Sequence, residues 1–166
     1  MPIAYLALGA NLGDRAEILR RALAALPPAF HVETVSPVYE TAPMYVEAQP
    51  KFLNLVCRVS TGLLPHEALH ALKLLETALG REITFRFGPR AIDLDILFYE
   101  DITLDTPDLT LPHPRLHERA FVLVPLNDIA PDFIHPKFGL TVKQLLDQLP
   151  PEARDQAQRA DIPPLN

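Results

Sequence analysis

An arginine-rich stretch that leads into an acidic, apolar segment holds the residues of this chain best suited to chemistry. Its sequence is Arg86-Phe87-Gly88-Pro89-Arg90-Ala91-Ile92-Asp93-Leu94-Asp95-Ile96-Leu97. Because side chains alternate faces along a strand, Asp93 and Asp95 should point the same way, roughly 7 Å apart. Two carboxylates beside clustered arginines suit a hydrated divalent cation and a chain of phosphates.

An Asp-x-Asp pair can also be no more than the solvated face of a strand. Here the flanking residues are apolar and predict a well-buried strand: Ile92, Leu94, Ile96, Leu97 and Phe98. Carboxylates in such a strand are costly unless a cation neutralises them. We therefore favour metal ligands, and magnesium in particular, because hard oxygen ligands together with substrate phosphates are its usual setting.

The charge distribution around the pair favours a polyanionic ligand bound through metal ions. Arg81, Arg86 and Arg90 make the preceding stretch positive, whereas residues 93–108 are rich in acids and contain no Lys or Arg. ATP carries roughly four negative charges near neutral pH, and bare carboxylates would repel it. Two magnesium ions would reverse that sign, and arginines would stabilise the charge that moves to a leaving group.

The totals predict one soluble globular domain, because the chain has 166 residues, of which 48% are hydrophobic and 22% charged. We expect the domain to cover residues 1–150 and residues 151–166 to form a disordered tail. The net charge of −6 argues against a nucleic-acid-binding protein. No leader sequence and no apolar stretch of membrane length is present, so we expect a cytoplasmic protein, with a monomer favoured.

Cys57 is the single cysteine, so an internal disulfide is excluded. Cys57 lies in an apolar run, which favours a buried, inert thiol over a nucleophile.

The hydrophobic periodicity predicts the element order strand, helix, strand, strand, helix, strand. The expected strands are residues 3–10, 30–39, 52–61 and the acid-bearing segment to residue 99; the expected helices are 14–26 and 65–79, with Gly80 as the stop of the second. Further helices are expected near residues 120–129 and 141–149. This is the ferredoxin-like order of an α+β protein, with helices on one face of an antiparallel sheet.

Asn54 interrupts the apolar run from Phe52 to Val56. A buried amide needs partners, and Asn54 offers a donor and an acceptor that match the edge of a heterocyclic amide. An amide satisfied by a neighbouring loop is an equally good interpretation. Phe52 and Phe121, viewed singly, are more typical of core residues than of ligand-stacking residues.

Three other features favour structural roles on local grounds. His113, between Pro112 and Pro114, is typical of a surface turn. Glu76 lies at the edge of an apolar helical stripe, where a boundary salt bridge is the default. The segment from Gly9 to Asp14 lacks both the P-loop and the dinucleotide-binding glycine spacing, so it indicates a tight strand-to-helix turn.

Taken together, several segments resemble the 6-hydroxymethyl-7,8-dihydropterin pyrophosphokinase family, which moves a diphosphate from ATP to a pterin alcohol in folate biosynthesis. The resemblance covers about residues 3 to 140. It rests on residues 8–14, 36–41, 52–54, 88–95, 112–115 and 119–123. The Gly-Pro-Arg-x-x-Asp-x-Asp element at residues 88–95 is the most specific of these.

The resemblance implies a role for each matching residue. Asp93 and Asp95 would bind two magnesium ions, and the catalytic residues would be Asp95, Arg90 and Arg81. The residues that would hold the pterin, with the two phenylalanines sandwiching its ring, are Thr41, Ala42, Met44, Phe52, Asn54 and Phe121. Those that would hold ATP are Glu76, Arg81, Arg90, Ile96, Thr110, His113 and Arg119.

The chain departs from the family pattern in the arginine-rich stretch. Ile83 stands where a second arginine is expected, and Phe87 stands where many members have tryptophan. The acid pair is unaffected.

We therefore expect diphosphoryl transfer to a pterin, in which the hydroxymethyl oxygen attacks the β-phosphorus of ATP and AMP leaves. One rival is a metal-dependent phosphohydrolase or nuclease that uses the same acids. Another is a non-catalytic ligand-sensing module of the same fold.

Overall fold

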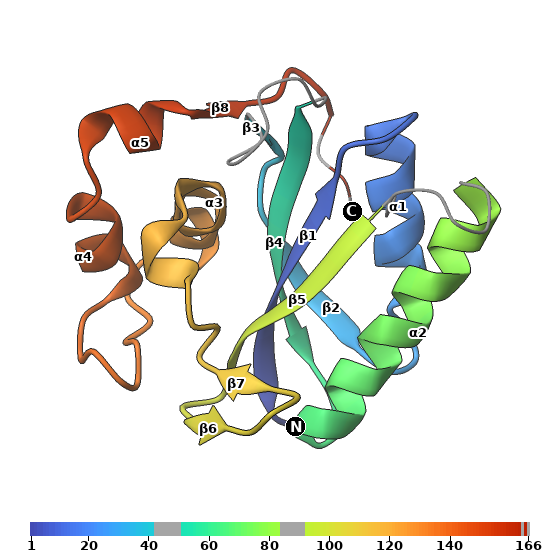
Figure 1. Cartoon of the computed structure of the whole chain (residues 1–166), viewed down its shortest axis with the longest axis horizontal. Coiled ribbons are helices and arrows are strands. Elements are labelled where there is room, and N and C mark those ends of the chain that lie inside the picture. The colour runs from blue at the N-terminus through green and yellow to red at the C-terminus, as the bar shows by residue number, and fades with distance from the viewer. Residues whose placement is uncertain (42–50, 84–91, 164, 166) are drawn as a thin grey trace.

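An antiparallel sheet forms the centre of the molecule. The computed structural model describes residues 1–41, 51–83, 92–163 and 165, with residues 81–83 described by their backbone alone. The strands of the sheet are β1 (Ile3–Ala10), β2 (His31–Val35), β3 (Tyr39–Thr41), β4 (Phe52–Ser60), β5 (Ile92–Tyr99) and β8 (Ala157–Arg159). Their order is β5-β1-β4-β3-β8, and β2 also pairs with β4 (Figure 1).

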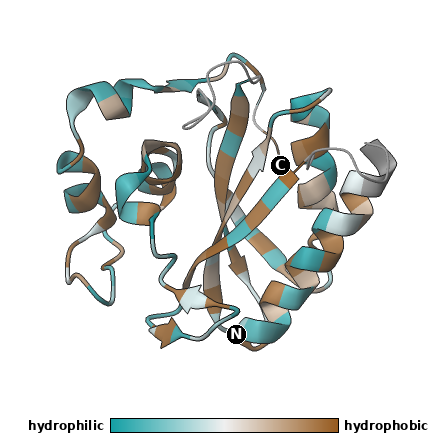
Figure 2. Cartoon of the chain, in the orientation of Figure 1, coloured by the Kyte–Doolittle hydropathy of each residue, from teal (hydrophilic) through white to brown (hydrophobic). Residues whose placement is uncertain are grey.

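One face of this sheet is covered by α1 (Arg15–Ala25) and α2 (Pro65–Ile83), which are the two helices expected between the strands (Figure 1). Asp14 caps α1 by accepting a hydrogen bond from the Glu17 backbone N–H at 3.2 Å, as the capping spacing predicts. The strands alternate, so Leu8 and Leu94 point into the core beneath α1 and α2. Figure 2 shows the same alternation of hydrophobic and hydrophilic residues along the first half of β5.

The opposite face is covered at one end by α3 (Ala120–Ile129) and α4 (Val142–Asp147), so the expectation of helices on one face was wrong. The reason lies in the strands. They carry Tyr5, Val56, Leu97 and Phe98 on this face, and these large apolar side chains form a second core with the two helices. Where the same face instead bears Gly9, Asn54 and Asp93, the helices leave it open to a pocket.

A register shift in β5 helps to build this second core. Tyr5 pairs with Phe98, whereas Leu6 pairs with Ile96, so Leu97 is an extra residue in β5. As a result Leu97 and Phe98, although adjacent in sequence, both belong to the cluster under α3 and α4.

Two boundaries differ from the sequence prediction. α2 does not stop at Gly80 but continues to Ile83, because a glycine inside a helix costs only about 1 kcal/mol and Gly80 is not among the glycines with positive φ. The expected strand over residues 30–39 divides into β2 and β3. Between them the Ser36 Oγ accepts a hydrogen bond from the Val56 N–H at 2.9 Å, and Pro37 has no N–H to donate.

The chain after residue 150 also differs from expectation, since it forms α5 (Pro151–Asp155) and β8 rather than a disordered tail. β8 pairs with β3, whose outer edge would otherwise present unpaired backbone groups. Just beyond β8, the Ala160 N–H donates to the Val38 carbonyl at 2.8 Å, and Leu165 is buried in the core beneath α1 and α2.

Cys57 is fully buried in β4, and burial raises the pKa of its thiol to about 12. The prediction of an inert thiol is therefore confirmed, because the reactive thiolate is disfavoured at neutral pH. Within the described ranges, no helix has both the length and the apolar character needed to cross a membrane.

Candidate active site

A pocket lies on the α3 side of the sheet, where β1, β4 and β5 meet the N-terminus of α3. It has a volume of about 180 Å³, below the roughly 300–1,000 Å³ of most ligand pockets. Its lining residues are Ala7, Leu8, Gly9, Thr41, Phe52, Asn54, Leu55, Asp93, Asp95, Arg119, Phe121 and Val122. A space of this size suits a small ring system better than a whole nucleotide.

The register of the sheet explains why these residues meet. Gly9, on the central strand β1, pairs with Asn54 of β4 on one side and with Asp93 of β5 on the other. Asp95 follows two residues after Asp93 and lines the same pocket, as the strand alternation predicts. The amide and the two carboxylates are therefore held at one end of the sheet by backbone pairing, on opposite sides of a glycine.

Asn54 is fixed in orientation by its neighbour on β3. Its Nδ2 donates to the Thr41 Oγ1 at 2.7 Å, and both side chains are buried. One of the two amide N–H groups is thus satisfied within the protein, in line with the structural interpretation. The amide still lines the pocket, so Asn54 serves the fold and presents a polar edge to the cavity.

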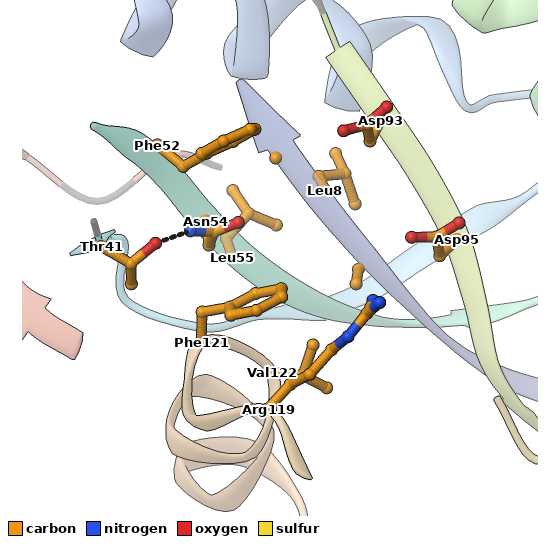
Figure 3. A pocket seen from close by; sticks show the side chains of 12 residues that line it. Leu8, Thr41, Phe52, Asn54, Leu55, Asp93, Asp95, Arg119, Phe121 and Val122 are labelled. Atoms are coloured by element: carbon orange, nitrogen blue, oxygen red, sulfur yellow. Dashed lines mark hydrogen bonds between the residues drawn. The ribbon is translucent and has the colours of Figure 1, made fainter. Parts of the chain in front are cut away.

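Phe52 and Phe121 are not sealed in the core but line the pocket with part of their surface exposed. Figure 3 shows their rings on either side of Asn54, with Phe52 coming from β4 and Phe121 from the first turn of α3. Two aromatic rings flanking a polar amide form a slot for a flat heterocycle.

Arg119 immediately precedes α3 and contributes positive charge to the pocket. Its side chain points toward Asp95 in Figure 3, and its guanidinium carbon lies 5.5 Å from the centre of the Phe121 ring. Its buried Nε has no hydrogen-bond partner among the residues that the structure describes. Among the described residues, no side chain caps the N-terminus of α3, so the helix dipole adds to the positive potential there. The pocket can thus accept an anionic group near the two carboxylates.

The carboxylate pair fits a magnesium site. In the described part of the chain there is no group of three or more His, Cys, Asp or Glu side chains able to enclose a metal ion. Asp93 and Asp95, both partly exposed at the pocket, are oxygen ligands of the kind that magnesium binds while keeping waters and substrate phosphates in its other positions.

Comparison with known proteins agrees with this geometry. Residues 5–131 match the family model described as 7,8-dihydro-6-hydroxymethylpterin-pyrophosphokinase (HPPK). The chain belongs to the HPPK family. The matched residues include strands β1 to β5 apart from the first residues of β1, together with α1, α2 and α3, and they contain every residue that lines the pocket.

Similar HPPK-related proteins fall into two size groups. The folic acid synthesis protein FOL1 of Dictyostelium discoideum is 44% identical over 148 residues, which are 89% of this chain but 22% of that protein. Thus this chain spans about a fifth of that longer relative. The 2-amino-4-hydroxy-6-hydroxymethyldihydropteridine pyrophosphokinase of Aquifex aeolicus is 41% identical over 144 residues, covering 87% of this chain and 90% of that one.

Among solved structures, an HPPK-DHPS in complex with substrates matches 88% of this chain and 43% of its own, with a TM-score of 0.74 and 18% identity. At that identity the likeness concerns the fold. It confirms the ferredoxin-like α+β class predicted from the element order.

Four of the residues that the HPPK resemblance assigns to ATP do not line the pocket: Glu76, Ile96, Thr110 and His113. Ile96 is buried in the core on the other face, so its backbone is what could contact a ligand. Thr110 lies in β7 (Thr110–Leu111), which pairs with β6 (Leu104–Asp105). Ala42, Met44, Arg90 and the side chain of Arg81 lie outside the described residues.

Glu76 supports the strand that bears the carboxylates. Its Oε2 accepts a hydrogen bond at 2.9 Å from the N–H of Leu94, which lies between Asp93 and Asp95 on the edge strand β5. Its Oε1 lies 3.4 Å from the Lys73 Nζ, and the side chain is 9% exposed. The boundary salt bridge predicted for Glu76 is therefore confirmed, and the hydrogen bond to β5 adds a second role that the sequence did not indicate.

We expect Glu76→Ala to lower the free energy of unfolding by about 1–3 kcal/mol, because it leaves the Leu94 N–H without its acceptor. Glu76→Gln keeps a carbonyl oxygen in place and should cost clearly less. Urea denaturation of both variants measures the difference. Equal losses in the two variants would contradict the hydrogen bond as the source, since alanine and glutamine have similar helix propensity.

His113 is held in the turn before α3. Its N–H donates to the Leu97 carbonyl at 2.9 Å, and its Nδ1 accepts from the Arg115 N–H at 3.2 Å. Burial, with the nearby charges of Arg119 and Arg115, lowers the pKa of His113 to about 4. Burial likewise lowers the pKa of His135 to about 4. Both rings are therefore neutral in the folded protein at neutral pH.

Stability is expected to fall as the pH drops from about 6.5 toward 4. In that window the histidines of the unfolded protein bind protons and those of the folded protein do not, so protonation stabilises the unfolded state relative to the folded state. The contribution of the two neutral histidines to the free energy of unfolding is fully present above the ordinary histidine pKa of 6.5. Denaturation at a series of pH values measures the slope, which should become shallower in His113→Asn and His135→Asn, where the amide oxygen can replace the accepting Nδ1. An unchanged slope in both variants would contradict this assignment.

Gly9 is the most consequential of the pocket residues that sequence reasoning missed; the others are Ala7, Leu8, Leu55 and Val122. The sequence placed Gly9 at the end of the strand expected over residues 3–10 and at the start of a tight turn, without a role in binding, whereas the structure shows that Gly9 lines the pocket together with Ala7. Two small residues at alternate positions of a buried strand were the available signal, because they leave space above one face.

Proposed function

We propose that this protein transfers a diphosphate from ATP to the hydroxymethyl group of 6-hydroxymethyl-7,8-dihydropterin, releasing AMP, as a step of folate biosynthesis. The observation that carries the proposal is one pocket that contains both a slot for a flat heterocycle and a pair of carboxylates. The similarity to the Aquifex aeolicus protein, which is named as a pyrophosphokinase of the same pteridine, supports the choice of substrate.

In this proposal the pterin ring lies between Phe52 and Phe121, and its polar edge meets Asn54. The Thr41 hydroxyl holds the Asn54 amide in one orientation, so the amide needs no reorganisation on binding. Ala42 and Met44, which follow Thr41 in sequence, would complete the pterin site. The hydroxymethyl group would then point along the pocket toward β5.

The carboxylates Asp93 and Asp95 would hold two magnesium ions, which would supply positive charge to the phosphates of ATP. Arg119, with its unpartnered buried Nε among the described residues, would bind a phosphate oxygen. Arg81 and Arg90 are proposed to stabilise the charge that develops on the leaving group. Glu76, Ile96, Thr110 and His113 are proposed to contact the remainder of ATP outside the pocket.

The reaction proposed is an in-line displacement. The pterin hydroxymethyl oxygen forms a bond to the β-phosphorus, and the bond from that phosphorus to the oxygen bridging the α-phosphorus breaks. AMP leaves with the bonding electron pair, and Asp95 accepts the proton of the alcohol. The protein acts mainly by positioning both reactants and by balancing charge.

The deciding experiment is incubation of the protein with ATP, magnesium and reduced hydroxymethylpterin, followed by chromatography of the nucleotides. We expect AMP and pterin diphosphate in equal amounts. ADP in place of AMP, or nucleotide breakdown that proceeds equally well without the pterin, would support a phosphohydrolase instead. Binding of both substrates without any product would support a sensing module.

We further propose that the catalytic and binding residues all lie within residues 1–150, while β8 and Leu165 complete the sheet and the core. We also propose that the protein acts as a cytoplasmic monomer on small molecules, without nucleic-acid or membrane partners. Size-exclusion chromatography with light scattering tests the monomer. A stable dimer at micromolar concentration would contradict it.

A further inference from the structure

Gly9 occupies a position in the pocket where no side chain fits. A Cβ built on Gly9 would lie 2.8 Å from the Asn54 Oδ1 and 3.7 Å from the Phe52 Cδ1. The first distance is shorter than real Cβ contacts, so a neighbour would have to move. Gly9 does not have a positive φ, so backbone conformation is not what requires glycine here. Glycine is required because there is too little space above the strand for a Cβ.

The Asn54 amide cannot move away at little cost. Its Nδ2 donates a hydrogen bond to the Thr41 Oγ1 at 2.7 Å, and the residue as a whole is 6% exposed. Turning the amide to relieve a contact at Oδ1 would break this hydrogen bond in a buried setting. Thr41 can therefore hold the Asn54 amide in its present orientation because Gly9 has no side chain.

Gly9 also lies between the two halves of the pocket. In the sheet it pairs with Asn54 on one side and with Asp93 on the other. A side chain here would stand between the amide that meets the ring and the carboxylates that meet the phosphates. It would also narrow the slot at the Phe52 ring.

We propose that Gly9 is a specificity-determining residue, whose missing side chain leaves the space in which the pterin fits between Phe52 and Phe121 and contacts a correctly oriented Asn54. Gly9 acts through Asn54 and through the shape of the slot, so it is a positioning residue. The inference rests on the proposed function, because it takes the pterin as the molecule in the slot.

The first test is Gly9→Ala, with Gly62→Ala as the matched control. Gly62 lies outside the pocket, and a Cβ there would meet only the Met1 Sδ, at an ordinary 3.8 Å. We expect the KM for the pterin to rise about tenfold or more in Gly9→Ala, since small displacements at a reacting site have large effects. The KM for ATP should stay within about twofold, and Gly62→Ala should match the parent protein. An unchanged pterin KM, or equal rises for both substrates, would overturn the proposal.

The second test asks whether the effect passes through Asn54, and it needs no activity. We expect Gly9→Ala to lower the melting temperature of the parent protein but to lower it much less in an Asn54→Ala background, where no Oδ1 meets the new methyl group. Equal losses in both backgrounds would overturn the contact. The parent protein reports on the proposed function separately: if it fails to form pterin diphosphate, the function is wrong, whereas a productive parent with an unaffected Gly9→Ala variant refutes the inference alone.

Discussion

Replacing Asp93 or Asp95 with asparagine is expected to lower turnover about a thousandfold while the protein remains folded. Asparagine has nearly the same shape as aspartate but no charge. The one remaining carboxylate would no longer bind the cations that offset the phosphate charge. Both positions are partly exposed at the pocket, so the fold should tolerate an uncharged side chain of the same shape. We therefore expect melting temperatures close to that of the parent protein when both are measured without magnesium. Single-turnover assays and thermal denaturation measure the two effects.

The matched control is Asp105→Asn, because Asp105 is an exposed acid on β6 outside the pocket. It should turn over at the parent rate. If Asp93→Asn and Asp95→Asn each kept more than about a tenth of the activity, the carboxylates would not be the metal ligands.

Asn54→Ala is expected to lower kcat/KM for the pterin by roughly a hundredfold. About 3 kcal/mol of binding free energy is lost when the buried polar edge of the pterin loses the Asn54 amide as its hydrogen-bond partner. ATP binding in the absence of the pterin should be nearly unchanged, since the amide lies in the slot between the two rings (Figure 3). Fluorescence titration with the pterin and, separately, with a nucleotide analogue distinguishes the two.

Asn127→Ala is the control for this substitution, because Asn127 is a partly buried amide on α3 that does not line the pocket. It should leave pterin affinity intact. Should Asn54→Ala weaken both ligands equally, a general loss of structure at the end of β4 would be the better explanation, and the role of the amide in reading the ring would be lost.

The parts of the site that the sequence predicted are those set by local pattern. Period-two alternation alone places Asp93 and Asp95 on one face, and helical periodicity with the Asp14 cap defines α1. Neither conclusion depends on which strands pair with one another in the sheet. The common face of the acid pair is thus readable from ten residues of sequence.

The parts that could not be predicted depend on which segments pair across the sheet. Nothing near Gly9 in sequence reveals that Asn54 and Asp93 flank it, because those partners are about 45 and 84 residues away. The helices on the second face follow from the shared side of Tyr5, Val56 and Phe98, which becomes apparent only once the strands are in register. Gly80 shows the opposite failure, in that a local stop signal was overridden by the packing of α2 on β5.

The roles of three residues that the sequence left ambiguous become clear from their meeting in one pocket. Phe52, Asn54 and Phe121 each had an adequate structural explanation when considered singly. Their meeting in one pocket, from β4 and α3, is a tertiary fact, and it explains why two aromatic residues remain partly exposed. The family resemblance anticipated this meeting, whereas the residue patterns by themselves did not.

The position of β8 has a consequence for how the protein is made. β3, which ends at Thr41, receives its outer partner from residues 157–159, and Leu165 fills the core still later in the chain. At about 5–20 residues per second, a ribosome would release this stretch several seconds after β3 has emerged. During that interval the edge next to the substrate slot is open to solvent and to other chains. The nascent protein should therefore gain ligand affinity only after β8 has emerged and docked on β3.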